Sequence, residues 1–285
     1  MKRLIINIMS ESRLFVLLLT ITTTLLQNSC AHASQVDTVS IYSPAMHKTI
    51  RCLVITPSDY SVLGQPYPTL YLLHGWSGNY TGWRNEAPQL PTLADRYQML
   101  IVCPDGGYDS WYLDSPVNST VRYDTHLSKE VVAYVDHYYH TRRERTGRAI
   151  AGLSMGGHGA LSLAIRHPDV FGAVGSICGG MDLRPFKKNG WDLQGILGSP
   201  DTQWQNWEDY SVINLVPRLK NANLQIIIDC GLGDFFLDVN RAMHQRLLEA
   251  RIPHEYTERP GEHNAAYWGS AIDVQAVFFH KFFSR

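Results

Sequence analysis

The most constraining feature of this sequence is Gly-Leu-Ser-Met-Gly at residues 152–156, which directly follows the apolar run 148–151. A Gly-x-Ser-x-Gly motif between a strand and a helix is typical of a nucleophile elbow, a sharp turn that lifts a serine hydroxyl clear of the sheet edge. We expect only glycine to fit at 152 and 156, because a Cβ there would collide with the neighbouring strand and helix. The motif therefore predicts a reactive Ser154 on a strand–turn–helix unit.

Apolar, β-rich runs alternate with helix-like patterns along the chain. This alternation predicts a mostly parallel sheet covered on both faces by helices, and with the elbow it indicates an α/β-hydrolase fold of eight strands. Residues 180–222 show no strand pattern, which leaves room for a small excursion above the sheet but not for a large cap domain. The expected strands are residues 37–42, 50–56, 68–73, 98–103, 148–152, 172–178, 223–229 and 254–259. Apolar helical stripes are expected at Leu127, Val131, Tyr134, Val135 and Tyr138, at Phe236, Val239, Met243 and Leu247, and at Trp268, Ile272, Ala276, Phe279 and Phe283.

The first 33 residues have the pattern of a secretory signal peptide. Basic residues precede an apolar run, 14–26, that is too short for a membrane anchor, and Ala31-His32-Ala33 resembles a cleavage site. We therefore expect a mature α/β-hydrolase domain over residues 34–285, exported to the periplasm or secreted, with no membrane span. The alternatives are an uncleaved anchor and a lipoprotein formed at Cys30, whose preceding residues fit a lipidation motif poorly.

Charge and motif content exclude several classes of protein. Removal of residues 1–33 takes away three basic and one acidic residue and changes the formal charge from −1 to −3, so no basic surplus favours nucleic acid. The sequence contains no Gly-x-x-x-x-Gly-Lys loop, no His-Glu-x-x-His motif and no zinc-like cysteine spacing, so we expect no cofactor and no metal. The later cysteines lie in apolar runs and are expected to be buried thiols. Pairing of Cys178 with Cys230 stays open, and the sequence sets no oligomeric state.

Serine is a weak nucleophile at neutral pH, so it needs a base, and the base needs an acid that fixes its tautomer. In this fold the chain order is serine, acid, histidine, and the acid follows the seventh strand. Asp234 lies on the loop after that strand and is the favoured acid, although aspartate there would also suit a helix N-cap. Asp229, inside the strand, and Asp238, in the following helix, are its rivals. Of the later histidines only His263 lies on the loop after the eighth strand, so it is the expected base.

The tetrahedral intermediate of acyl transfer also needs backbone donors for its oxyanion. One is expected from the residue after the nucleophile, Met155, and the other from the loop after the third strand. That strand ends in Leu73-His74-Gly75-Trp76, so the second donor is expected to be the Trp76 N–H. Because His74 precedes Ser154 in the chain, we expect it to hold the loop rather than to act as the base.

Several spaced motifs together resemble the esterase D group of α/β-hydrolases. This group includes S-formylglutathione hydrolases, feruloyl and acetyl xylan esterases, and mycolyltransferases, and the resemblance covers residues 40–283. It implies the triad Ser154, Asp234 and His263, with an oxyanion hole from Trp76 and Met155. Asn264-Ala265-Ala266 departs from the group, many of whose members have an aromatic residue there. The motifs are Leu72-Leu73-His74-Gly75, Trp83, residues 151–157, Cys230-Gly231-x-x-Asp234 and Pro260-Gly261-x-His263.

The resemblance implies a serine esterase that works through an acyl-enzyme. Export argues against the cytosolic hydrolysis of glutathione thioesters and favours short or aryl acyl esters of carbohydrate, so the expected partner is a small-molecule or carbohydrate ester. Trp111, Trp204 and Trp207, together with Trp76, are candidate platforms for a sugar or feruloyl ring. The alternatives are acyl transfer to a sugar hydroxyl, thioester hydrolysis, and a non-catalytic binding protein, against which the intact nucleophile, acid and base argue.

Overall fold

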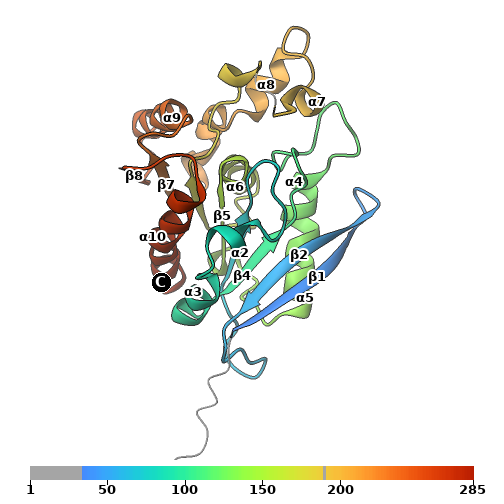
Figure 1. Ribbon diagram of the computed structural model, residues 1–285, viewed down its shortest axis with the longest axis vertical. Coiled ribbons are helices and arrows are strands. Elements are labelled where there is room, and N and C mark those ends of the chain that lie inside the picture. The colour runs from blue at the N-terminus through green and yellow to red at the C-terminus, as the bar shows by residue number, and fades with distance from the viewer. Residues whose placement is uncertain (1–33, 189–190) are drawn as a thin grey trace, which may run out of the picture. The chain divides into compact units, whose positions relative to one another are not determined.

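The computed structural model describes residues 34–188 and 191–285, so the expected signal peptide lies outside the described residues. These residues build an eight-stranded sheet with the strand order β1-β2-β4-β3-β5-β6-β7-β8 (Figure 1). β1 and β2 are antiparallel to their neighbours, whereas every pairing from β4 to β8 is parallel. The strands are β1 (Gln35–Ser43), β2 (Lys48–Thr56), β3 (Thr69–Leu73), β4 (Leu100–Pro104), β5 (Arg148–Leu153), β6 (Ala173–Ile177), β7 (Gln225–Gly231) and β8 (Glu255–Arg259).

The eight expected strands are all present, and each observed boundary lies within two residues of the expected one. The largest correction is at β7, which continues to Gly231 rather than ending at Asp229. It is longer because Cys230 and Gly231 pair with Glu258 and Arg259 of β8. The α/β-hydrolase architecture predicted from the sequence is confirmed.

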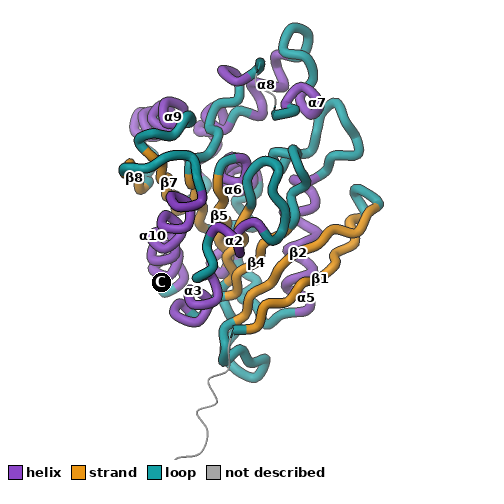
Figure 2. The backbone as a smooth tube through the Cα atoms, viewed as in Figure 1, coloured by secondary structure: helices purple, strands orange, loops and turns teal. Residues whose placement is uncertain are grey.

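Helices cover both faces of the sheet (Figure 2). The buried side chains form two hydrophobic cores. Within β3, Leu70 and Leu72 face one core while Tyr71 and Leu73 face the other, as the two-residue period of a strand requires. One core is closed by η1 (His126–Val131), α5 (Val132–Tyr138), α6 (Met155–Arg166), η4 (Val212–Asn221) and α9 (Leu237–Glu249). The other is closed by α2 (Gly82–Glu86), α3 (Leu90–Tyr97) and α10 (Ala265–Phe283).

The first expected helical stripe is only partly buried. η1 is a short π-helical turn, and Leu127, Val131 and Val135 do enter the core. Tyr138, in contrast, is 63% exposed. Its ring packs against that of Tyr134, with 4.5 Å between the ring centroids, instead of against the sheet. Its assignment to the buried face was therefore wrong.

The segment 180–222 forms a small excursion beyond the sheet (Figure 1). Its described residues contain no strand, as expected, and they form η3 (Arg184–Phe186), α7 (Leu193–Leu197), α8 (Trp204–Tyr210) and η4. Leu193, Ile196 and Trp207 tie it to the core beneath. Across residues 34–188 and 191–285, no helix has the length and apolarity needed to cross a membrane.

Candidate active site

Ser154 occupies the turn between β5 and α6 in an unusual backbone conformation. Its φ of 54° and ψ of −119° lie outside the regions that non-glycine residues prefer, which costs on the order of 1–3 kcal/mol. The surrounding structure holds it there, and one restraint is the bond from the Ser154 N–H to the Ile177 carbonyl of β6, at 2.9 Å. The turn directs the Ser154 side chain into a pocket.

The two glycines of the elbow, Gly152 and Gly156, permit close approach of β3, β5 and α6. A Cβ on Gly152 would lie 2.3 Å from the Gly156 backbone, and a Cβ on Gly156 would lie 2.2 Å from the Leu73 carbonyl oxygen. Real Cβ atoms essentially never come closer than 3.0 Å to another heavy atom. The expected steric reason for both glycines is therefore confirmed, and it brings the end of β3 against the start of α6.

A hydrogen-bonded relay starts at Ser154. The Ser154 hydroxyl lies 2.8 Å from Nε2 of His263, and Nδ1 of His263 lies 2.7 Å from Oδ2 of Asp234. The carboxylate accepts a hydrogen bond from the Nδ1–H group, which leaves Nε2 free to accept one from the serine hydroxyl. Asp234 also accepts from the Phe236 N–H at 2.7 Å, but Phe236 and not Asp234 is the N-cap residue of α9. Loops after β5, β7 and β8 thus bring the three residues together.

The environment of His263 favours its protonated form. Burial by itself lowers the pKa of His263, but the hydrogen bonds to Asp234 and Cys178 and the Asp234 charge outweigh it, so the pKa is raised from its ordinary 6.5. An imidazole that readily takes a proton suits a general base. The same contacts orient the ring toward Ser154.

The rival acids are engaged elsewhere. Asp229 is fully buried, where Arg259 donates to it at 2.9 Å and the Tyr267 hydroxyl donates to its other oxygen. Burial raises the pKa of Asp229, and Tyr267 and Arg259 offset only part of this effect. Asp238 is exposed on the first turn of α9. Neither residue hydrogen-bonds to His263 within the described part of the chain.

The loop after β3 is fixed by His74. Its Nδ1 donates to the Gly75 carbonyl and its Nε2 accepts from the Gly106 N–H, both at 2.8 Å. This agrees with the structural role expected of His74. Trp76 follows on that loop, and Met155 is the first residue of α6. Among the described residues neither backbone N–H has a hydrogen-bond acceptor, and the positive end of the α6 dipole lies beside Ser154.

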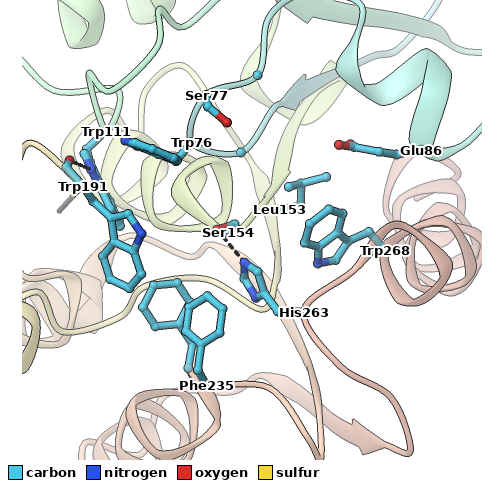
Figure 3. A pocket seen from close by; sticks show the side chains of 13 residues that line it. Trp76, Ser77, Glu86, Trp111, Leu153, Ser154, Trp191, Phe235, His263 and Trp268 are labelled. Atoms are coloured by element: carbon cyan, nitrogen blue, oxygen red, sulfur yellow. Dashed lines mark hydrogen bonds between the residues drawn. The ribbon is translucent and has the colours of Figure 1, made fainter. Parts of the chain in front are cut away.

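A cavity of about 340 Å³ opens above Ser154 (Figure 3). On one side of Ser154 lie aromatic rings, including Trp76 and Trp111, and on the other lie Glu86 and Trp268. The Glu86 carboxyl therefore distinguishes the second side of the cavity from the first. The lining residues are Gly75, Trp76, Ser77, Gly78, Glu86, Trp111, Leu153, Ser154, Trp191, Phe235, Phe236, His263 and Trp268.

Two of the expected substrate-binding tryptophans do not line this cavity. Trp207 is fully buried in the core, where its indole donates to the Gly198 carbonyl at 3.1 Å. Trp204 is 41% exposed on α8 and packs beside the Lys187 ammonium. Only Trp111 of the three reaches the pocket, so the placement of Trp204 and Trp207 in the site was wrong.

The sequence interpretation missed several side chains that line the pocket, among them Glu86, Trp191, Phe235 and Trp268. Phe235 and Trp268 lie within five residues of Asp234 and His263, respectively. Proximity to the predicted acid and base was therefore the signal that could have found them. No comparable signal marked Glu86, at the end of α2, or Trp191, because both are far from the predicted acid and base in the sequence.

Cys178 and Cys230 are free, fully buried thiols beside the relay. Their sulfur atoms and a carboxylate oxygen of Asp234 all lie within 4.8 Å of one another. We assign no metal to this group, because both Asp234 oxygens are engaged by His263 and Phe236. Moreover, contact with Cys230 and burial raise the pKa of Cys178 well above its ordinary value, which disfavours the thiolate that a metal needs.

Comparison with known proteins supports one family. The family described as "Putative esterase" matches residues 43–279. An esterase of Mycobacterium tuberculosis is 31% identical over 238 residues, which cover 74% of this chain and 51% of that protein, so the chain spans about half its length. An acetyl esterase of Caldicellulosiruptor saccharolyticus is 25% identical over 261 residues, covering 82% of this chain and 94% of that protein. A solved ferulic acid esterase superposes with a TM-score of 0.75 at 28% identity, covering 88% and 99% of the two chains.

Proposed function

The chain belongs to this esterase family, and from that premise we propose that it is a serine carboxylic ester hydrolase that works through an acyl-enzyme. The observation that carries the proposal is the relay from Ser154 through His263 to Asp234, at the base of a cavity. Nucleophile, base and orienting acid are the parts that acyl transfer by a serine requires.

In the first half of the reaction, the Ser154 hydroxyl oxygen attacks the carbonyl carbon of the ester. His263 takes the serine proton on Nε2, while Asp234 holds the ring through Nδ1 and stabilises the imidazolium that forms. The Asp234 carboxylate keeps its negative charge throughout. His263 then passes the proton to the alkoxide oxygen, and the alcohol leaves.

The negative charge on the carbonyl oxygen needs donors that are already in place. The backbone N–H groups of Trp76 and Met155 are the proposed oxyanion hole, and the N-terminal end of α6 adds a favourable field. Loss of one such donor typically costs about 10²–10³-fold in kcat. In the second half of the reaction water replaces the alcohol, His263 again acts as base, and the acid is released.

We propose short or aryl acyl esters of carbohydrate as the substrates. Two relatives carry the names acetyl esterase and ferulic acid esterase. The cavity of about 340 Å³ is small, aromatic side chains line one side of it, and the excursion at 180–222 is short. The signal peptide expected from the sequence favours an exported enzyme, for which acylated polysaccharide outside the cell is an accessible substrate.

The test of the mechanism is Ser154→Ala, with Ser162→Ala on the same helix as the matched control. We expect Ser154→Ala to lower kcat/KM for p-nitrophenyl acetate by about 10⁴-fold or more at an unchanged Tm. Ser162, which contacts Arg166, should tolerate the change. Activity of the Ser154 variant within tenfold of wild type would refute the serine mechanism.

The test of the substrate class compares acyl groups. Each methylene buried in a deep apolar channel would contribute about 0.8 kcal/mol, but a small cavity offers no such gain. We therefore expect kcat/KM to be highest for acetyl to butyryl esters or methyl ferulate and to fall by octanoyl. A preference for palmitoyl esters would contradict this substrate class, as would acyl transfer to trehalose faster than hydrolysis.

A further inference from the structure

Three of the side chains that line the cavity beside Ser154 each carry a buried polar atom that no protein group satisfies. Within the described residues, Oε2 of Glu86 and the indole nitrogens of Trp76 and Trp268 are buried and have no hydrogen-bond partner. A buried polar atom left alone costs about 1–3 kcal/mol, so such atoms are rare unless a ligand completes them. Three of them in one cavity indicate that the natural ligand brings polar groups of its own.

The position of Glu86 is set by packing between two distant segments. It ends α2, and this helix packs near the start of α10 so closely that a Cβ on Gly269 would lie 2.5 Å from the Glu86 carbonyl oxygen. Gln89 reinforces the contact by donating to the Gly269 carbonyl at 2.7 Å. Figure 3 shows the Glu86 carboxyl turned toward the cavity on the side where Trp268 lies, opposite Trp111 and Trp191.

The donor and acceptor pattern identifies the ligand group. Glu86 offers an acceptor, while the two indole N–H groups need acceptors. An ammonium or guanidinium group would bring donors only, and a carboxylate would bring acceptors only. A hydroxyl both donates and accepts, and a hydroxylated molecule can satisfy the carboxyl and the indoles together.

We propose that Glu86 is a specificity-determining residue that accepts a hydrogen bond from a hydroxyl group of the ester substrate, next to Ser154. The proposal rests on the proposed esterase function and narrows its substrates to hydroxylated esters. The hydroxyl belongs either to the alcohol half, as in a sugar or polyol, or to a phenolic acyl half. Burial raises the pKa of Glu86, with His74 only partly opposing it, so the carboxylate form gains most from a donor that the substrate supplies.

The experiment measures how strongly the enzyme prefers a hydroxylated ester over a matched ester without that hydroxyl. One pair is glycerol monoacetate against propyl acetate, which probes the alcohol half. The other is methyl ferulate against methyl 3,4-dimethoxycinnamate, which probes the phenol. In at least one pair we expect wild type to prefer the hydroxylated ester by about 10- to 100-fold in kcat/KM. Glu86→Met should reduce that ratio to about 1, whereas Glu249→Gln, on the exposed face of α9, should leave it unchanged.

The outcomes separate the two proposals. If wild type hydrolyses p-nitrophenyl acetate but Glu86→Met leaves both ratios as they were, the hydroxyl subsite is refuted and the esterase function stands. If wild type hydrolyses no ester, the esterase function fails. In that case calorimetry on the Ser154→Ala protein still decides the subsite, because glycerol monoacetate or methyl ferulate should bind about tenfold more tightly than its partner, and equal affinity in both pairs would overturn the proposal. A Tm measurement on Glu86→Met separates loss of the subsite from loss of the fold.

Discussion

Gly156→Ala tests whether close packing at the elbow builds the site. The added Cβ would lie 2.2 Å from the Leu73 carbonyl oxygen and 2.6 Å from that of His74. Both atoms belong to backbone, so no side chain can turn away. To reach even 3.0 Å, the end of β3 must retreat from α6 by about 0.8 Å, and an overpacked core of this kind costs about 1–3 kcal/mol.

The expected result is a loss of both stability and activity. For a domain of this size, 1–3 kcal/mol corresponds to a fall in Tm of roughly 2–12 °C. The retreat of β3 also carries Trp76 away from Ser154, and a displacement near 1 Å at a reacting centre costs about 10²-fold in rate. Thermal unfolding and kcat for p-nitrophenyl acetate measure the two effects.

Gly195→Ala is the matched control. Gly195 lies within helix α7, and a Cβ there would meet nothing within 4 Å. This variant should gain up to about 1 kcal/mol from helix propensity and keep its activity. If Gly156→Ala matches wild type within 1 °C and twofold in kcat, then close approach of β3 and α6 does not build the site, and the steric argument is refuted.

Three further predictions follow from the same relay and from the chain's first residues. Asp234→Asn should lower kcat by orders of magnitude because it permits the wrong imidazole tautomer. Asp229→Asn should keep kcat within tenfold but reduce the unfolding free energy by about 1–3 kcal/mol, because it weakens the contacts with Arg259 and Tyr267. The reverse pattern would make Asp229 the acid. Because the pKa of His263 is raised and only neutral His263 is a base, kcat/KM should rise with pH through a midpoint above 6.5, and a midpoint below 6.5 would contradict this. The stability gained from protonated His263 is complete below pH 6.5 and is lost as pH rises through the folded-state pKa. Mass spectrometry of the protein from its host should find an N-terminus near Ser34 without lipid, and an acylated Cys30 would contradict this prediction.

The sheet was predictable because its signals are local. Most of the central strands are short apolar runs, and β3 and β5 are buried along their whole length because helices cover both faces. The positions of Ser154, Asp234 and His263 could also be predicted, since each lies within four residues of a strand end and the parallel strand order brings these strand ends to one edge. When a motif lies next to a strand end, the sequence predicts both the residue type and its position in the fold.

The walls of the cavity were less accessible from the sequence. Glu86 ends α2 and Trp191 lies in a loop, and their positions depend on packing between segments far apart in the sequence, such as Gly269 against Glu86. Trp207 was misplaced for a related reason. A tryptophan in a polar segment suits a binding surface as well as a core, and only the tertiary structure shows that its ring is buried and its indole is bonded to Gly198.

The backbone of Ser154 has a consequence for how such a chain can evolve. At φ 54° a glycine would relax where the serine is strained. A chain selected only for resistance to unfolding would therefore replace its own nucleophile, so the presence of serine at 154 is itself a record of selection for reactivity. At this position the protein gives up some folding stability and gains a reactive side chain.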